Sequence, residues 1–432
     1  MSKPNVIVCL CDQLRAFEVG CYGNSVVRTP NIDRLAENGV RFETACSNNP
    51  VCSPSRASLL TGQYSRTCAG MLLNADFHPP LKQRTQLLNT TMPEVFRNAG
   101  YHTSLIGKWH IKPHPLTVGF DDALFPCFRH RYTGQTFIRN FGEDFPVEDY
   151  SPEYEIEQVS RLLQENTERP FFLYYNISPP HMPLHDVPEF YRTLYGRDDV
   201  PLRKNVWRDG RMPWDERWFK IYLWDFLYYL HHQPHTERLP DGFDLRDLTA
   251  LYYGLTSWVD DLVGRLIDEL KARGLLDNTL IVFTSDHGDN LGSHHLFNKG
   301  SLIEESIRIP LIFHFPQRLH TLLNRSQVAS IVDVMPSVLG LLGIPIPEGV
   351  QGTDLSTVLL GQHNSVGENV AYIETYPGEI GIRTATHLYG IKADVKNRQG
   401  NECTVLDDRY MFFDLDNDPY ELNNIAMTED NA

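Results

Sequence analysis

The chain has 432 residues, of which 41% are hydrophobic and 22% charged, and its formal net charge is −16. A chain of this length is too long for a single hydrophobic core of ordinary size, which favours one large domain with a small second one. The composition is that of a globular protein. The acidic balance argues against nucleic acid as a partner. Any site for an anion must therefore be built from local cations and a metal.

The start of the chain contains one apolar run, residues 6–11, which is too short and too poorly flanked by basic residues for a signal peptide. No stretch approaches the length of a membrane span, so we expect no membrane association. The eight cysteines are scattered, and Cys9 and Cys11 fall inside an expected strand. This pattern favours a reduced cytoplasmic protein over a disulfide framework.

Short apolar runs alternate with helical patterns along most of the chain. Buried strands are expected at residues 5–10, 101–106, 171–177 and 280–284. Helices are expected from Pro30 to Gly39, after a capping box at Thr91 and Glu94, and over residues 245–273. Strands separated by helices predict an α/β fold, with a mostly parallel central sheet flanked by helices.

The pattern changes near residue 366 to short strands with turns, expected at 371–375, 382–384, 388–392 and 410–413. We therefore predict a catalytic α/β domain over 1–365 and a small C-terminal antiparallel α+β subdomain over 366–432. Within the first domain, residues 183–243 form an aromatic-rich insertion with four of the six tryptophans. Stacking of Trp207, Trp214 and Trp218 on a sugar is one interpretation, and packing of a lid or dimer contact is the favoured one.

Polar side chains follow each of the four predicted strands. In chain order they are Asp12 with Gln13, Lys108 with His110, His181, and Asp286 with His287. In open α/β sheets, ligands bind beyond the carboxyl ends of the strands, so we expect these groups to meet at one face. The hard oxygens of Asp12, Gln13 and Asp286, with a nitrogen of His287, suit a divalent cation such as Ca²⁺ or Mg²⁺.

The segment Cys52-Ser53-Pro54-Ser55-Arg56 stands at the expected start of a helix that Gly62 ends. The positive end of a helix dipole favours anions, and the guanidinium of Arg56 suits tetrahedral oxyanions. A thiolate would be a soft, mismatched ligand beside hard oxygen ligands. The mismatch favours an oxygen-based working group made from a modified Cys52.

Together these segments resemble the type I, formylglycine-dependent sulfatases of the alkaline phosphatase superfamily, over nearly the whole chain. The matching segments are Asp12-Gln13, residues 29–35, residues 52–56 with 59–62, residues 107–110, 180–183, 285–288 and 299–300, and residues 414–421.

The resemblance implies that Cys52 is converted to formylglycine by a maturation enzyme and that its hydrate hydrolyses an organic sulfate ester. The implied metal ligands are Asp12, Gln13, Cys52, Asp286 and His287. The implied catalytic residues are Cys52, Arg56, Lys108, His110, His181 and Lys299, with His181 or Lys299 as the acid for the leaving alcohol. One divalent ion is expected, Ca²⁺ in the first place and Mg²⁺ or Mn²⁺ otherwise. The substrate is a small-molecule or carbohydrate sulfate ester, and an oligomer remains open.

Several alternatives accompany this hypothesis. Gln13 and His287 stand where the family pattern has Asp and Asn, as in formylglycine phosphonate monoester hydrolases and some sulfatases, so phosphonate or phosphodiester hydrolysis stays open. A metal-binding module without catalysis would leave the implied catalytic cations unexplained. A cysteine amidohydrolase that uses Cys52 would leave the carboxylates of Asp12 and Asp286 unexplained. A zinc site of His287, His294 and His295 lacks a completing ligand set. Arg15, His185, Arg208 and Arg211 can read charged substrate groups, although most are expected to be solvated.

Overall fold

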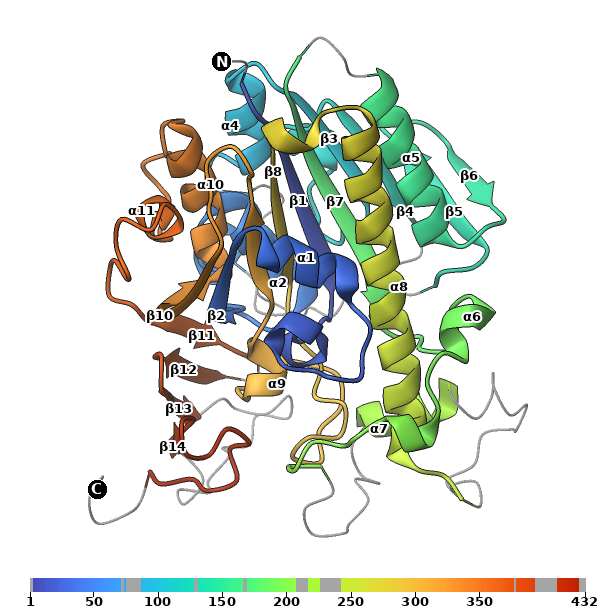
Figure 1. Ribbon diagram of the computed structural model, residues 1–432, viewed down its shortest axis with the longest axis vertical. Helices are drawn as coiled ribbons and strands as arrows, with labels where there is room; N and C mark the ends of the chain where they lie inside the picture. Colours follow the sequence, from blue (N-terminus) through green and yellow to red (C-terminus); the bar gives the residue numbers. More distant parts are fainter. Residues whose placement is uncertain are drawn as a thin grey trace.

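A computed structural model of the protein describes residues 3–70, 74, 87–127, 131–165, 169–206, 217–225, 242–376, 378–392 and 410–426. A large central sheet runs through the molecule with helices on both of its faces, and a smaller sheet lies beside one edge (Figure 1). The predicted α/β class and the predicted small antiparallel sheet are both confirmed.

The strands of the large sheet are β1 (Asn5–Asp12), β2 (Val40–Cys46), β3 (His102–Gly107), β4 (Asp122–Pro126), β5 (Gln135–Arg139), β6 (Asp144–Val147), β7 (Phe171–Pro180), β8 (Thr279–Ser285), β9 (Leu311–His314) and β10 (Leu322–Ser330). Their order is β10-β2-β9-β8-β1-β7-β3-β4-β5-β6. The central run from β8 to β4 is parallel throughout. Among these described strands, the antiparallel pairs lie around β9 and towards the β5–β6 edge. The carboxyl ends of the central strands therefore share one edge of the sheet.

Helices cover both faces of this sheet (Figure 1). They are α1 (Pro30–Glu37), α2 (Cys52–Thr61), α3 (Ser65–Cys68), α4 (Met92–Asn98), α5 (Ser151–Glu165), α6 (Glu189–Arg192), α7 (Arg217–Asp225), α8 (Leu245–Ala272), α9 (Glu304–Ile307), α10 (Val334–Leu342) and α11 (Ser356–Leu359). Helices α1, α5, α7 and α8 contribute to one buried cluster, and α2, α4, α10 and α11 contribute to the other.

Strand β1 explains why the central strands have continuous apolar runs. Its side chains alternate between the two buried clusters: Ile7, Cys9 and Cys11 lie in one, and Val6, Val8 and Leu10 in the other. A strand covered on both faces has no solvent-facing side, so its sequence does not alternate with polar residues. The same burial holds β1, β7 and β8 rigidly behind the polar residues that follow them.

The four predicted strands are confirmed, and all four extend further at their carboxyl ends. The sequence did not reveal β2, β4, β5, β6, β9 or β10. Strands β4, β5 and β6 have only four or five residues and are partly exposed, and β9 has four, so their apolar patterns are too short to distinguish from loops. The capping box of Thr91 and Glu94 begins α4 as expected.

The smaller sheet consists of β11 (Ala371–Glu374), β12 (Glu379–Arg383), β13 (His387–Lys392) and β14 (Tyr410–Asp414), paired in that order and antiparallel. It shares a buried cluster with the large domain, in which Ala371 and Leu388 join Cys46, Ile307 and Val328. The domain boundary near residue 366 stays a prediction.

Some expectations fall on the aromatic-rich insertion. Trp207, Trp214, Arg208 and Arg211 lie outside the described residues, and α7 is described without the side chain of Trp218. Within the described part of the chain, no helix has the length and apolar character needed to cross a membrane.

Candidate active site

Cys52 is the first residue of α2, and the whole of this helix is buried. The preceding residue, Val51, offers no capping side chain; instead Asn74 accepts a hydrogen bond from the backbone N–H of Ser53 at 3.0 Å. Gly62 ends the helix in the left-handed region, with φ of +61°, as the sequence predicted. The side chain of Cys52 thus stands at the positive end of a buried helix, where an anion is favoured.

The structure brings every residue predicted for the site into one buried cluster. Asp12 and Gln13 come from the end of β1, Lys108 and His110 follow β3, and His181 follows β7. Asp286 and His287 follow β8, and Lys299 comes from the loop beyond them. The shared edge of parallel strands therefore assembles groups that are up to 287 positions apart in the chain, from position 12 to position 299.

Arg56 lies at the centre of this cluster and is completely buried. Its Nε donates to Asp286 Oδ2 at 2.9 Å and its Nη2 to Asp12 Oδ2 at 3.0 Å, while Nη1 donates to the carbonyl of Lys108 at 3.1 Å. Lys108 Nζ lies 2.5 Å from the same Asp12 oxygen. Buried charges are tolerated only when each has a partner, and these contacts provide the partners.

Cations surround the sulfur of Cys52. Lys299 Nζ donates to Sγ at 2.8 Å, His287 Nε2 lies 3.2 Å from it, and Asp12 Oδ1 lies 3.6 Å away. Burial alone would raise the pKa of Cys52, but Lys299, Lys108 and His287 outweigh it and hold this pKa well below its ordinary value. The position is therefore built to stabilise negative charge.

Other cysteines show the opposite behaviour. Burial raises the pKa of Cys46 to about 12, and it raises those of the buried Cys9 and Cys11 and of the partly buried Cys21 as well. At these thiols the cost of burying a charge outweighs any nearby cation, which is the reverse of the balance at Cys52. The contrast separates one reactive position from cysteines that only pack in the core.

Two histidines present their Nε2 atoms to the site. The Nδ1 of His287 lies 2.8 Å from the carbonyl of Gly288, and the Nδ1 of His181 lies 2.6 Å from that of Met182. A carbonyl can only accept, so Nδ1 carries the proton in both rings. Burial, with Lys299 and Lys108, lowers the pKa of His181 to about 4, which leaves its Nε2 unprotonated at neutral pH.

The donor set fits a hard divalent cation. Ligand atoms of Asp12, Cys52, Asp286 and His287 all lie within 4.8 Å of one another, and all four residues are buried. Two carboxylates and an imidazole suit Ca²⁺, Mg²⁺ or Mn²⁺, and the fit improves if an oxygen replaces the sulfur at position 52. Gln13 Oε1 adjoins this set, because Lys299 Nζ lies 2.8 Å both from it and from Cys52 Sγ.

Arg15 is an exception to the expected solvation of the four possible substrate-reading residues, and several site residues were missed. Arg15 is 2% exposed, pairs with Glu18 at 2.6 Å and donates to the carbonyl of Asp289. Sequence reasoning missed Asp289, Asn298 and Tyr222, which contact the amide of Gln13. Asp289 directly follows the Asp286-His287-Gly288 motif, which was an available signal, whereas nothing in the sequence linked Tyr222 to the site.

A second group of possible metal ligands consists of His294, Glu305 and Glu421 and does not include His287. Glu305 is already paired with Arg203 at 2.6 Å and accepts from Asn205 at 2.8 Å, and Glu421 accepts from the backbone N–H of Glu304. Both carboxylates of this group therefore already have hydrogen-bonding partners within the described residues.

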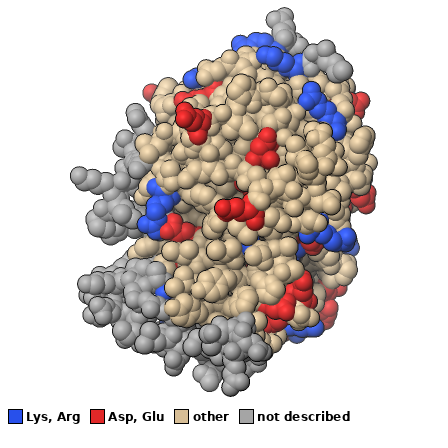
Figure 2. Space-filling view, turned by 90° about the vertical axis from the view of Figure 1, so that its left-hand side faces the viewer, with Lys and Arg blue, Asp and Glu red and all other residues tan. Residues whose placement is uncertain are grey.

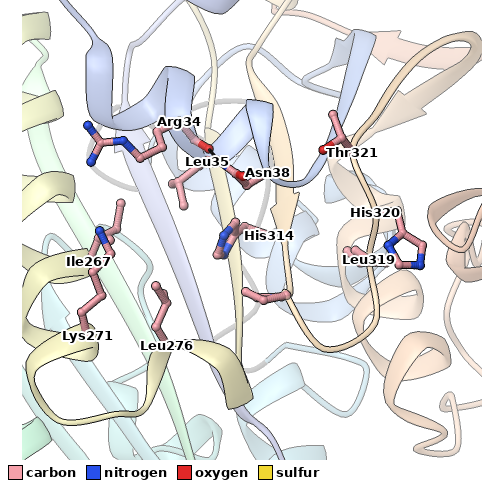
Figure 3. Close-up of a pocket in the computed structure, with 11 residues that line it drawn as sticks. Arg34, Leu35, Asn38, Ile267, Lys271, Leu276, His314, Leu319, His320 and Thr321 are labelled. Atoms are coloured by element: carbon pink, nitrogen blue, oxygen red, sulfur yellow. Dashed lines mark hydrogen bonds between the residues drawn. The ribbon is translucent and has the colours of Figure 1, made fainter.

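A separate pocket of about 410 Å³ lies at the opposite edge of the sheet (Figure 3). Its lining includes Leu276, which precedes β8, and His314, which ends β9, together with Lys271 and Arg34. On the face shown in Figure 2, acidic and basic side chains are interspersed singly and in small groups. Arg56 and Lys108 are buried, so the positive charge that they bring near Cys52 lies inside the fold.

Comparisons with known proteins agree with this geometry. The Sulfatase family model matches residues 4–344, and the model described as N-sulphoglucosamine sulphohydrolase, C-terminal, matches residues 292–432. An ulvan-active sulfatase of Formosa agariphila is 29% identical over 442 residues, covering 98% of this chain and 77% of that protein. An N-acetylglucosamine-6-O-sulfatase of Bacteroides thetaiotaomicron is 28% identical over 477 residues, covering 98% and 83%.

Solved structures share the fold. A protein in complex with its substrate D-glucosamine-2-N,6-O-disulfate has a TM-score of 0.78 at 24% identity, covering 100% of this chain and 95% of that one. A phosphonate monoester hydrolase of Agrobacterium radiobacter has a TM-score of 0.71 at 22% identity, covering 99% and 92%. The fold is one that a phosphonate monoester hydrolase also adopts, and the cluster lies at the strand ends where hydrolases of this fold could bind a ligand. By its sequence, the chain belongs to the sulfatase family and is a sulfuric ester hydrolase.

The two buried carboxylates depend on Arg56 for their stability. We expect Arg56→Met to lower the free energy of unfolding by about 3–5 kcal/mol, because it leaves Asp12 and Asp286 short of a partner. The matched control is Arg66→Met, which breaks a surface ion pair between Glu374 and an arginine side chain that is 62% exposed, and should cost less than about 1 kcal/mol. Urea unfolding followed by circular dichroism measures both, and equal losses would contradict the role given to Arg56.

Proposed function

We propose that the protein hydrolyses an organic sulfate ester by means of a formylglycine hydrate at position 52, assisted by one divalent cation. The observation that carries this proposal is the surroundings of Cys52 Sγ: a helix start, the ammonium group of Lys299, and a cluster of metal-type ligands that includes His287 converge on this single atom. The sequence from Cys52 to Arg56 also resembles the family's maturation signature.

An oxygen at position 52 explains chemistry that sulfur does not. A hydrated aldehyde supplies one hydroxyl that attacks the sulfur atom of the ester. Deprotonation of its second hydroxyl then expels sulfate, a release that neither cysteine nor serine permits. A bound divalent cation would polarise the sulfuryl oxygens and lower the pKa of the attacking hydroxyl. Asp12, Gln13, Asp286 and His287 are the side chains that would hold it.

The remaining side chains orient the ester and stabilise its charge. Lys108 and Lys299 are proposed to bind the sulfate oxygens, where their ammonium groups stabilise the charge that spreads in the transition state. Arg56 holds Asp12 and Asp286 in place through the contacts described above. His110, which lowers the pKa of Cys52, and His181 are proposed to complete the pocket.

A sulfated carbohydrate is the substrate class that the relatives favour. One relative is an ulvan-active sulfatase, another an N-acetylglucosamine-6-O-sulfatase, and one structural neighbour binds a sulfated glucosamine. We infer that this chain acts on a sulfate ester of a sugar.

The maturation of Cys52 is directly measurable. We expect the peptide containing residue 52 of active protein to have the mass of formylglycine rather than cysteine. Cys52→Ala should retain the fold and lower kcat by at least about a thousandfold, because the nucleophile is lost. Fully active protein with an unmodified thiol would contradict the mechanism.

The competing function is hydrolysis of a phosphonate monoester or phosphodiester, which stays open because Gln13 and His287 resemble the residues of formylglycine phosphonate hydrolases and of some sulfatases at these positions. We expect kcat/KM for 4-nitrophenyl sulfate to exceed that for 4-nitrophenyl phenylphosphonate by at least about tenfold. The shared leaving group makes the two rates directly comparable. A preference for the phosphonate would overturn the sulfatase assignment in favour of the alternative.

His181 is proposed as the acid that protonates the leaving alcohol. Because its pKa is lowered to about 4 by burial and by Lys299 and Lys108, its protonated fraction grows as pH falls from 7 towards 5. We therefore expect kcat/KM for a sulfated sugar, which has a poor leaving group, to rise over this interval, and His181→Asn to abolish the rise.

The same variant distinguishes protonation from binding. His181→Asn should lower the rate for the sulfated sugar by about a hundredfold or more, with a much smaller effect on 4-nitrophenyl sulfate, whose leaving group needs no proton. Lys299→Ala, which removes a proposed sulfate contact, should lower both rates alike. If the two variants affected the two substrates in the same proportion, the role of His181 as the acid would be rejected.

A further inference from the structure

The side-chain amide of Gln13 is held from both ends. On the nitrogen side, Nε2 donates to Asp289 Oδ2 at 2.5 Å and to Asn298 Oδ1 at 3.1 Å, and it lies 2.9 Å from the hydroxyl of Tyr222. On the oxygen side, Oε1 accepts from Lys299 Nζ at 2.8 Å. An ammonium group can only donate and a carboxylate accepts, so both ends require the same orientation of the amide.

The backbone of Gln13 is held in place by hydrogen bonds, so rotation of the side-chain amide is the main movement left to this residue. Its N–H donates to Asp286 Oδ1 at 3.1 Å, and its carbonyl accepts from Tyr252 at 2.5 Å. Its φ of +68° is uncommon for a residue with a side chain, so the surrounding contacts must hold the backbone there. A rotation of the amide by half a turn would change little in shape but would exchange a metal-binding oxygen for an N–H group.

Asp289 is itself fixed by its neighbours. Its side chain is fully buried, with Oδ1 accepting from the backbone N–H of Leu291 at 2.8 Å and Oδ2 accepting from the Tyr222 hydroxyl at 2.5 Å. Tyr222 comes from α7 and packs against Phe297, so it brings a distant element to the same carboxylate. Two donors therefore prevent Asp289 from turning away from Gln13.

We propose that Asp289, supported by Tyr222, is a positioning residue that fixes the amide of Gln13 with its oxygen towards the metal ligands. This inference rests on the proposed metal role of Gln13. It also explains why glutamine stands at this position: a carboxylate there would face the carboxylate of Asp289, and like charges at that distance repel. The identity of residue 13 and that of residue 289 are thus coupled.

Exchanging the two chemical groups tests this coupling. Calorimetric titration with Ca²⁺ compares four proteins: the full-length wild type, Asp289→Asn, Gln13→Glu and the double variant. Thermal unfolding without Ca²⁺ shows whether each of them is folded. We expect Asp289→Asn to weaken Ca²⁺ binding by about 10–100-fold, as is typical when a partner of a metal ligand is lost. Gln13→Glu alone should also weaken binding, because its new carboxylate faces Asp289.

The double variant should return to within about threefold of the wild-type affinity. Its amide, now at position 289, can donate to one oxygen of the carboxylate at position 13 and leave the other oxygen for the cation. Tyr222→Phe, which keeps the ring packing, should weaken binding, whereas the matched control Tyr253→Phe, which removes a hydroxyl that contacts Asn24, should not; thermal unfolding shows that both variants are folded at the titration temperature. The inference is overturned if Asp289→Asn binds Ca²⁺ as tightly as wild type, or if the double variant binds no better than Asp289→Asn.

The same titration separates this inference from the proposed function. Wild-type protein that binds no Ca²⁺, Mg²⁺ or Mn²⁺ would refute the metal role of the whole site. Wild-type protein that binds Ca²⁺, together with unaffected Asp289 variants, would refute only the positioning role. Binding with the expected coupling but without sulfate ester hydrolysis would refute the proposed activity and leave the positioning role in place.

Discussion

The structure depends above all on one buried guanidinium. Arg56 joins Asp12 at the end of β1 to Asp286 at the end of β8, and it does so from the first turns of α2. Both carboxylates and the guanidinium are fully buried, so each would be costly to desolvate without the others. The interaction therefore fixes the helix that bears Cys52 against the strand ends that bear the candidate metal ligands. Fold and site are stabilised by the same contacts.

This arrangement also resolves a conflict between the charge of the chain and its substrate. A net charge of −16 repels an anionic ester at long range, yet exposed charges are screened within about 8 Å at physiological salt. Inside the cluster, Arg56 and Lys108 are buried and the side chain of Lys299 is only 8% exposed, and low solvent access strengthens the effect of these cations on Cys52. Local cations decide which charge is favoured at position 52, as the lowered pKa of Cys52 shows.

The sequence was sufficient to predict those site residues whose position follows from the direction of the strands. Asp12, Lys108, His181 and Asp286 each come after a strand that is buried on both faces, and parallel strands bring their carboxyl ends to one edge. Lys299 lies in a loop and was identified only through the family resemblance. Tyr222 reaches the site from α7 across more than two hundred positions, and Arg15 is buried by tertiary packing. Local patterns contain no information about such contacts.

The coupling of Gln13 to Asp289 bears on how the proposed site treats anions. A ligand set of Asp12, Gln13, Asp286 and His287 has two negative charges, whereas the family pattern with Asp and Asn at the second and fourth positions has three. Here the third carboxylate, Asp289, does not belong to the ligand set but accepts hydrogen bonds from the amide of Gln13 and from Tyr222. A cation in this site would retain more of its positive charge towards the bound ester, because ligand charge sets how strongly a cation is offset. The exchange of Asp for Gln is therefore a change in the charge that the reacting anion meets, made possible by a carboxylate one layer further from it.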